Sequence, residues 1–128
     1  MCRDGVKAER TSWRDMGLSA RHRLWGFNCP MVDIDFLAVE FESREPAAII
    51  DYKHERNTRV DLKAPGIETL GKLGDRANLP VFVVHYSADY HWWRVYPVNS
   101  LAMAIYDKPT SLKESDYVKF LYSLRGRA

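Results

Sequence analysis

The alternation of hydrophobic and polar residues predicts two strands near the middle of the chain. The segment 32–42 alternates apolar and acidic residues at both ends, with the period of two that is typical of a strand. The turn residues 43–46 follow, and after them comes a short apolar run, 47–53. Because a short polar turn joins the two segments, we expect them to form an antiparallel hairpin.

A helix and two further strands are predicted next. Residues 65–77 carry apolar side chains at helical spacing, with Pro65 in the first turn. The continuous apolar run 81–86 is typical of a strand that is covered on both faces, and 91–96 is rich in residues that favour strands. A strand, a helix and a strand in succession indicate a parallel pair with a right-handed crossover. The sheet should therefore be mixed.

Helices are also predicted near both ends of the chain. Ser111 and Glu114 have the spacing of a capping box, and apolar residues follow at helical intervals, so we expect a helix over about 112–125. In the N-terminal third, 8–16 and 19–25 are predicted as helices. The expected fold class is α/β (α+β), a mixed four-stranded sheet flanked by helices in the order α-β-β-α-β-β-α.

Length and composition indicate one folded domain. The chain has 128 residues, of which 46% are hydrophobic, so we expect a single domain over 1–128. No segment approaches the roughly 20 apolar residues of a membrane span, and residues 1–10 lack the apolar core of a signal peptide. We therefore expect a soluble, cytoplasmic protein without a membrane partner. Cys2 and Cys29 form neither a disulfide framework nor a metal-binding CxxC motif.

Charge is distributed unevenly along the chain. The net charge is only +2, but 33–51 holds six acids and one base, and the segments on both sides are net basic. A metal site that acts on a polyanion has this layout, because carboxylates bind the cation while surrounding lysines and arginines bind phosphates. Ordinary solvated surfaces have a similar composition, so charge alone leaves both interpretations open.

The acids of the predicted hairpin fall on defined faces of its strands. Strand alternation places Asp33 and Asp35 on one face of the first strand, and Asp51 and Lys53 on one face of the second. Pairing of the two strands can bring these groups together. Carboxylates clustered with a lysine suit an oxygen-seeking cation such as Mg²⁺ better than zinc.

These residues resemble the PD-(D/E)XK nuclease superfamily, whose members have the restriction-endonuclease-like fold. The superfamily pattern is an Asp on one strand, then Asp or Glu, any residue and Lys on the next strand, within a core ordered helix, strand, strand, helix, strand. Here Asp35 precedes the apolar residues 36–39, and Asp51-Tyr52-Lys53 follows on the second strand. The resemblance covers about 19–97, with the C-terminal helix as an addition. Pro30 is not adjacent to the first Asp, and no Gln-xxx-Tyr motif follows Lys53, which is a departure from the RecB-like branch.

The resemblance implies a role for each of these residues. Asp35 and Asp51 would hold Mg²⁺, with Mn²⁺ as a substitute, helped by the main-chain carbonyl of Tyr52, and Lys53 would orient or activate the attacking water. Asp33 is an alternative to Asp35, and Glu9 on the predicted first helix is a candidate accessory ligand. The implied reaction is phosphodiester hydrolysis to 5′-phosphate and 3′-hydroxyl ends.

The implied function is that of a metal-dependent DNA endonuclease. Without a separate recognition domain we expect selectivity for DNA structure, such as junctions or branches, and a homodimer would supply two cuts; RNA stays open as a substrate. The candidate contacts to the DNA backbone are basic or polar residues that flank the acidic centre, namely Arg21, Arg23, His54, Arg56, Arg59 and Lys63. The alternatives are a catalytically inactive nuclease-fold module that binds nucleic acid or a protein, and an interaction protein with no role on nucleic acid.

Overall fold

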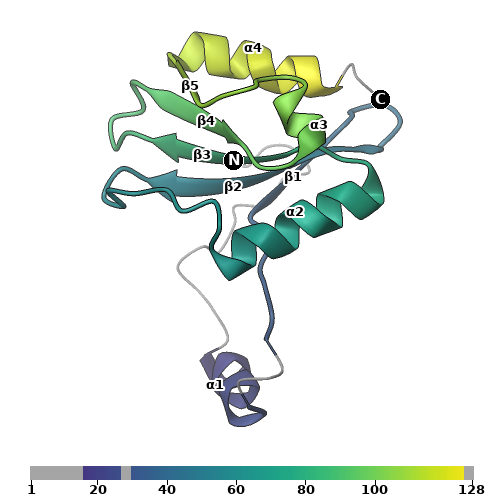
Figure 1. Cartoon of the computed structure of the whole chain (residues 1–128), viewed down its shortest axis with the longest axis vertical. Helices are drawn as coiled ribbons and strands as arrows, with labels where there is room; N and C mark the ends of the chain where they lie inside the picture. The colour runs from purple at the N-terminus through teal and green to yellow at the C-terminus, as the bar shows by residue number, and fades with distance from the viewer. Residues whose placement is uncertain (1–15, 27–29, 126–128) are drawn as a thin grey trace, which may run out of the picture. The chain divides into compact units, whose positions relative to one another are not determined.

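A mixed β-sheet forms the centre of the unit that spans residues 32–128 (Figure 1). The computed structural model describes residues 16–26 and 30–125, and the chain divides into two units, residues 1–31 and 32–128. The elements in chain order are α1 (Met16–Leu24), β1 (Phe36–Val39), β2 (Pro46–His54), α2 (Pro65–Ala77), β3 (Val81–Tyr86), β4 (Trp93–Pro97), α3 (Ser100–Met103), β5 (Thr110–Leu112) and α4 (Glu114–Arg125). The second unit is thus a mixed α+β structure.

The strands follow one another across the sheet in the order β1-β2-β3-β4-β5. β1 and β2 form an antiparallel hairpin in which Phe36 pairs with Ile50, and β2 and β3 are parallel with Ile50 paired to Phe82. β4 and β5 add antiparallel strands. The predicted hairpin, parallel pair and mixed sheet are therefore confirmed.

The prediction of four strands was wrong, because β5 adds a fifth strand in the described part of the chain. Ser111 was expected to cap the last helix, but it lies in β5 opposite Arg94, and its Oγ atom accepts a hydrogen bond of 3.0 Å from the Arg94 Nη1 atom. The helix begins at Glu114 instead. Since β5 has only three residues, its pattern is too short to be distinguished from a helix start. The four-residue helix α3 was not predicted either.

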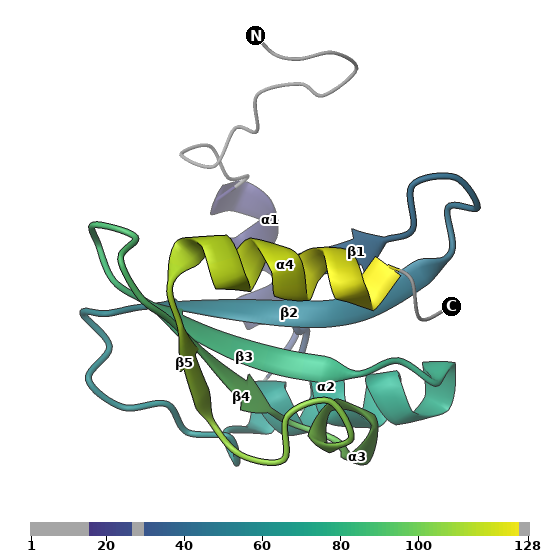
Figure 2. The same ribbon diagram turned by 90° about the horizontal axis from the view of Figure 1, so that it is seen from above.

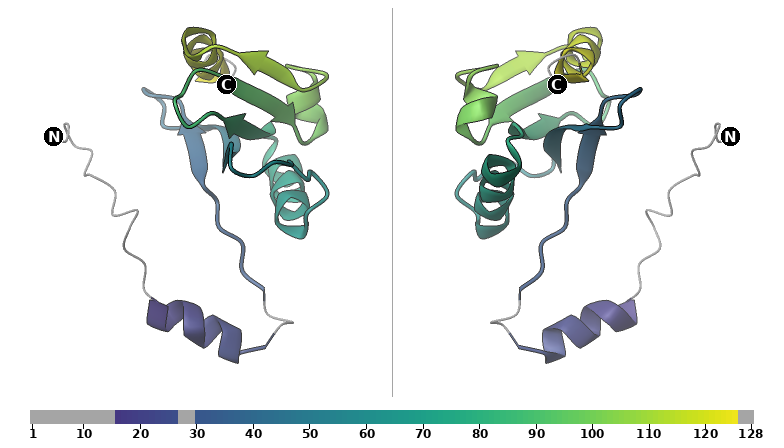
Figure 3. Two further views of the ribbon diagram at one scale, coloured as in Figure 1. Left: turned by 90° about the vertical axis from the view of Figure 1, so that its left-hand side faces the viewer. Right: turned by 90° about the vertical axis from the view of Figure 1, so that its right-hand side faces the viewer.

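Helices cover both faces of the sheet. The views from either side show the sheet between α4 and α2 (Figure 3), and the view from above shows α4 lying along β2 (Figure 2). Successive residues of β2 face the two layers in turn. Ile49 packs with Leu70 of α2 and Val81 of β3, whereas Ile50 belongs to the larger core that includes Phe120 of α4.

Close contact between α2 and β3 requires a glycine. A Cβ atom on Gly74 would lie 2.3 Å from Val81 Cγ2 and 2.8 Å from the Leu79 carbonyl oxygen. The side chain of Asn99 closes the same corner, because its Oδ1 atom accepts hydrogen bonds from the main-chain N–H groups of Val81 and Ala102. Asn99 is buried, so these bonds satisfy donors that water cannot reach.

The first strand is shorter than the predicted segment 32–42. Main-chain pairing with β2 begins at Phe36. The following N–H group of β2 on this side, that of Tyr52, donates its hydrogen bond to the Asp35 side chain instead of to a main-chain carbonyl. Pairing ends at Val39, where Glu40 starts the turn: the Glu40 Oε1 atom accepts hydrogen bonds from the N–H groups of Glu42 and Ser43. The apolar and acidic alternation therefore continues past both ends of the paired strand.

The first unit contains α1. Its last turn carries Arg21, His22 and Arg23, positive or polar groups that interact favourably with the carboxyl end of a helix. The expected helix 19–25 is thus found in part, at 16–24. Residues 8–15 of the other predicted helix lie outside the described residues. Within the described ranges, no helix has the length and apolar character needed to cross a membrane.

Candidate active site

The start of β1 brings one carboxylate against β2. Asp35 lies directly before Phe36, and its Oδ2 atom accepts a hydrogen bond of 3.3 Å from the main-chain N–H of Tyr52. Since Phe36 pairs with Ile50, the position of Asp35 is opposite Asp51. Two acids separated by sixteen positions in the sequence therefore meet at one end of the hairpin.

Asp51 and Lys53 form an ion pair on the same face of β2. The Lys53 Nζ atom lies 3.1 Å from the Asp51 Oδ2 atom. The Asp51 side chain is only 9% exposed, whereas that of Lys53 is 39% exposed. Asp51 is therefore held inside the sheet layer, while the ammonium group beside it reaches solvent.

The two carboxyl groups interact directly. Burial raises the pKa of Asp35, and the neighbouring Asp51 raises it further through a hydrogen bond and through its negative charge. The N–H of Tyr52 and the Lys53 ammonium lower the pKa of Asp35, but their effect is smaller. The raised pKa means that the charged form of Asp35 is disfavoured beside Asp51, and a bound cation would offset this effect.

The donor atoms at this point fit a hard divalent cation. The two carboxyl groups supply oxygen atoms, which such cations prefer as ligands. The Asp51 Oδ2 atom is buried and faces the Lys53 ammonium group, but it accepts no hydrogen bond from the described residues. No cluster of three or more His, Cys, Asp or Glu side chains suited to a metal occurs within residues 16–26 and 30–125. The fit therefore depends on the Asp35 and Asp51 pair, with main-chain oxygen and water to complete the coordination.

A polar row extends from this pair across the sheet. Lys53 is in register with His85 of β3, which is in register with Arg94 of β4, and residues in register present their side chains on one face. The Arg94 guanidinium donates hydrogen bonds to the Tyr96 hydroxyl and to Ser111 Oγ. The row thus reaches β5 and places a second cation on the face that carries Lys53.

His85 lies in the middle of this row. Its Nε2 atom is buried without a hydrogen-bond partner among the described residues. Its ring lies edge-on to Trp92, with 5.2 Å between centroids. The alternation within 81–86 and 93–97 is the signal that could have placed His85 and Arg94 on one face, but only the strand order shows that this is the face of Lys53.

The predicted DNA contacts lie on different elements of the chain. Arg56, Arg59 and Lys63 are exposed in the loop between β2 and α2, which leaves the sheet just after Lys53. His54 follows the alternation of β2 to the opposite face, where its ring contacts Tyr86 at a centroid distance of 5.4 Å. Arg21 and Arg23 are exposed on α1, in the first unit of the chain.

The remaining predicted ligands are placed as follows. Asp33 lies in the exposed extended segment before β1, two residues from Asp35. Tyr52, whose carbonyl was a candidate ligand, contributes its N–H group to Asp35. Glu9 lies outside the described residues.

An aromatic pocket on the opposite face was not predicted. It has a volume of about 350 Å³ and is lined by Phe36, Tyr52, Tyr86, Tyr90, Trp93, Glu114, Tyr117, Val118 and Leu121.

Comparison of the chain with protein-family models, with curated proteins and with solved structures gives no match.

Proposed function

We propose that this chain is a metal-dependent nuclease with a restriction-endonuclease-like core, which hydrolyses phosphodiester bonds in DNA. The observation that carries the proposal is the meeting of Asp35, Asp51 and Lys53 at the end of the β1–β2 hairpin. The order of hairpin, helix and parallel strand around this site supports the same assignment. The site also lies toward the carboxyl ends of the parallel strands β2 and β3, where open α/β sheets bind their ligands.

Asp35 and Asp51 would hold Mg²⁺, or Mn²⁺ in its place, with the Tyr52 carbonyl as a further oxygen ligand. When bound, the ion would polarise the scissile phosphate and lower the pKa of a coordinated water. The Tyr52 N–H group holds the Asp35 carboxylate in place, because it donates to the Oδ2 atom. Burial keeps Asp51 in one position, so the ligands are preorganised.

Lys53 has two tasks in this proposal. It neutralises Asp51 before substrate arrives, through the 3.1 Å ion pair. Its exposed ammonium group then stabilises negative charge on the attacking hydroxide and the phosphate. Arg94, in the same polar row, is fixed by Tyr96 and Ser111 and supplies a phosphate contact on the same face.

The loop 55–64 supports DNA as the substrate class. Its exposed Arg56, Arg59 and Lys63 extend positive charge from the end of β2 along the path toward α2. Phosphate contacts of this kind bind without sequence preference and weaken as the salt concentration rises.

A homodimer is the assembly we propose for cutting two strands. β1 is an edge strand, and its Leu37 and Val39 side chains are more than 40% exposed, as is Phe41 in the turn that follows. Exposed apolar residues on a sheet edge favour pairing with a second chain. Light scattering on the purified protein tests this: a mass near that of one chain contradicts the dimer.

Cleavage assays test the nuclease proposal directly. The purified chain is incubated with plasmid, linear duplex and branched DNA in Mg²⁺, in Mn²⁺ and in EDTA. We expect cleavage in the two metal ions alone, and loss of cleavage in Asp51→Asn and Lys53→Ala. Lys119→Ala is the matched control, because it removes one exposed lysine of α4, which lies on the face of the sheet opposite the carboxylate pair.

The possible results separate the two main interpretations. DNA left intact under all conditions, or cleavage by Asp51→Asn at the rate of the parent, contradicts the enzyme. Intact DNA together with binding that weakens steeply with salt would assign the chain to the non-catalytic nucleic-acid-binding modules instead.

A further inference from the structure

The aromatic pocket between α4 and the sheet carries a second site. Four of its rings are nearly parallel: Trp93 and Tyr117 stack with 4.8 Å between centroids and 4° between planes, and Tyr86 and Tyr90 stack with 6.1 Å and 6°. Tyr86 and Trp93 join the two pairs at 5.5 Å and 21°. Tyr52 is edge-on to three of these rings. The pocket therefore presents parallel flat surfaces, which suit a planar ring.

Tyr90 is the exposed end of this stack. It is 54% exposed, and its main chain has φ 63°, in the left-handed region that residues other than Gly, Asn and Asp rarely adopt. Such a conformation costs free energy and persists only where the surrounding contacts enforce it. An aromatic ring that is held in a strained position and left half in solvent indicates a binding role.

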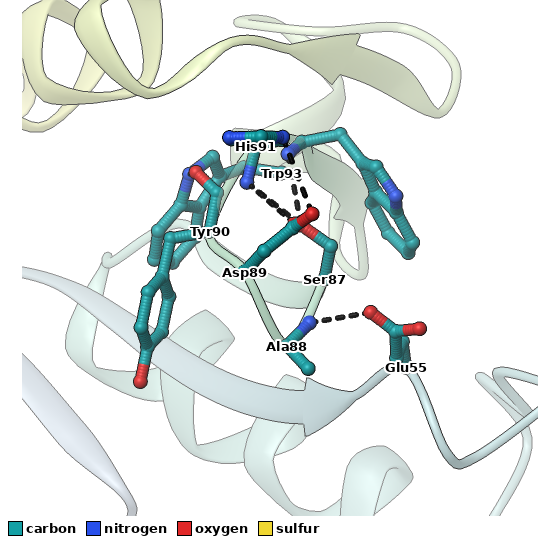
Figure 4. A network of polar contacts seen from close by, with 8 residues as sticks. Glu55, Ser87, Ala88, Asp89, Tyr90, His91 and Trp93 are labelled. Atoms are coloured by element: carbon teal, nitrogen blue, oxygen red, sulfur yellow. Dashed lines mark hydrogen bonds and ion pairs between the residues drawn. The ribbon is translucent and has the colours of Figure 1, made fainter.

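Polar contacts of the loop 87–92 enforce this conformation (Figure 4). The buried Ser87 accepts hydrogen bonds at Oγ from the N–H groups of His91 and Trp92, at 2.8 and 3.1 Å. The Tyr90 N–H donates to the Ser87 carbonyl, and the Trp93 Nε1–H donates to the Tyr90 carbonyl. Glu55, after β2, accepts a hydrogen bond from the N–H of Ala88. The loop is thus tied both to itself and to the strand that carries the candidate active site.

The pocket and the candidate active site are built from neighbouring residues of the β1–β2 hairpin. Phe36 lines the pocket and directly follows Asp35, while Tyr52 lines it from between Asp51 and Lys53. Since side chains alternate along a strand, the two sites lie on opposite faces at one end of the sheet. Because β1 is an edge strand, a nucleic-acid strand bound at the active site would pass around this edge to bring an unpaired nucleotide to the pocket.

We propose that this pocket binds the base of an unpaired nucleotide in the DNA strand that is held at the active site. This inference rests on the proposed nuclease function and deepens it, because it names DNA with unpaired nucleotides as the substrate class. A base in a duplex is covered by its neighbours, so only an unpaired or extruded base can stack on the exposed end of these rings. A volume of about 350 Å³ is at the small end of ligand pockets and suits one base rather than a longer ligand. Among the described residues that line the pocket, Glu114 supplies the carboxylate, which offers an acceptor for amino groups on a base.

A matched pair of oligonucleotides isolates the base. Two fluorescent duplexes carry one extra nucleotide in one strand, which is normal in the first and abasic in the second, so their phosphates are the same. Binding is measured by anisotropy at one stated salt concentration with the full chain carrying Asp51→Asn, which prevents cleavage. We expect the normal bulge to bind about 5- to 150-fold more tightly than the abasic one, the range expected for stacking of one base.

Variants locate the base on the protein. Tyr90→Ala should abolish the preference, Tyr90→Phe should keep it, and Tyr122→Ala should leave it unchanged, since Tyr122 is an exposed tyrosine of α4 that does not line the pocket. Equal binding of the two bulges overturns the proposal, as does a preference that survives in Tyr90→Ala. Saturable binding of tetramethylammonium that displaces neither of the two bulged duplexes would assign the pocket to a cation. That result would also overturn the proposal.

Cleavage by the parent protein in Mg²⁺ keeps this proposal separate from the nuclease proposal. Cleavage without a preference for the normal bulge defeats the base pocket alone. A preference for the normal bulge without cleavage in any metal ion defeats the catalytic function alone.

Discussion

The Asp35 carboxylate and the Tyr52 main-chain N–H are joined by a hydrogen bond of 3.3 Å between N and Oδ2. This bond fastens a residue that precedes β1 to the strand that carries Asp51 and Lys53. It takes the place of the next main-chain bond of the hairpin, so one interaction ends the strand pairing and positions a carboxylate. The geometry of the candidate site therefore depends on the side chain of Asp35.

The first prediction compares the two acids that precede β1. Asp35→Asn should reduce metal-dependent cleavage by about 100-fold or more, because it removes one of two anionic ligands while keeping the size of the side chain. Asp33→Asn is the matched control and should retain most of the activity. Initial rates on a bulged duplex check this, and a larger loss in Asp33→Asn would show that Asp33 is the ligand.

The second prediction concerns the ion pair of β2. Lys53→Met keeps the aliphatic length of the side chain but leaves the buried Asp51 without its 3.1 Å partner. We expect cleavage to fall by about 100-fold and the free energy of unfolding to fall by about 1 kcal/mol, since Lys53 is partly exposed and its pair is screened by solvent. Urea unfolding and initial rates measure the two effects. The double variant Asp51→Asn/Lys53→Met should recover the stability but not the activity; recovery of both contradicts the assigned roles.

The third prediction separates two glycines of α2. Gly74→Ala should destabilise the fold by about 1–3 kcal/mol, because its Cβ atom would lie 2.3 Å from Val81 Cγ2 and 2.8 Å from a carbonyl oxygen. Gly66→Ala, whose Cβ atom would have Val32 Cγ1 at 4.0 Å as its nearest neighbour, should be neutral or stabilising by up to about 1 kcal/mol. Urea titrations of both variants provide the comparison. Equal stability of the two would contradict the close packing of α2 on β3.

The fourth prediction is an alkaline loss of stability. Burial raises the pKa of the Tyr117 hydroxyl, and the adjacent Tyr52, 2.6 Å away between hydroxyl oxygens, raises it further. The folded pKa therefore exceeds that of the unfolded chain, about 10. The stability contributed by the neutral hydroxyl is complete below about pH 10 and declines as the pH rises above it, because the unfolded chain then releases its proton more readily.

Tyr117→Phe tests that prediction. It should cost about 1 kcal/mol at neutral pH through the lost hydrogen bond, and its stability should decline less steeply above about pH 10. Tyr122→Phe, at an exposed tyrosine of the same helix, is the control and should follow the parent. Urea unfolding at neutral and alkaline pH gives the comparison. Parallel curves for Tyr117→Phe and the parent would show that Tyr117 does not titrate as described.

The elements with long, consistent patterns could be predicted from the sequence. α2 has the predicted bounds, because Pro65 marks its first turn and its apolar spacing is regular, and β3 coincides with a continuous apolar run. β5 and α3 are too short for a period to be recognised. Ser111 is an example. The residue types around it occur both at helix starts and in edge strands, and only the pairing with Arg94 distinguishes the two.

Part of the candidate site could also be predicted from a regular pattern in the sequence. Alternation alone places Asp51 and Lys53 on one face, and a hairpin places Asp35 opposite them. The contribution of His85 and Arg94 depends on the order of strands in the sheet, which local patterns do not contain. The main-chain conformation of Tyr90 depends on local hydrogen bonds to Ser87 and on the contact of Glu55 with Ala88, and the sequence around Tyr90 carries no signature of the Glu55 contact.

The hairpin turn of residues 40–45 controls which side of β1 faces which layer. Because side chains alternate, removing one residue from this turn without a compensating bulge would rotate β1 by half a period relative to β2. Phe36 would then meet the charged pair of β2, and Asp35 would enter the aromatic layer beneath α4. The number of residues in the turn therefore determines which layer each side chain of β1 enters.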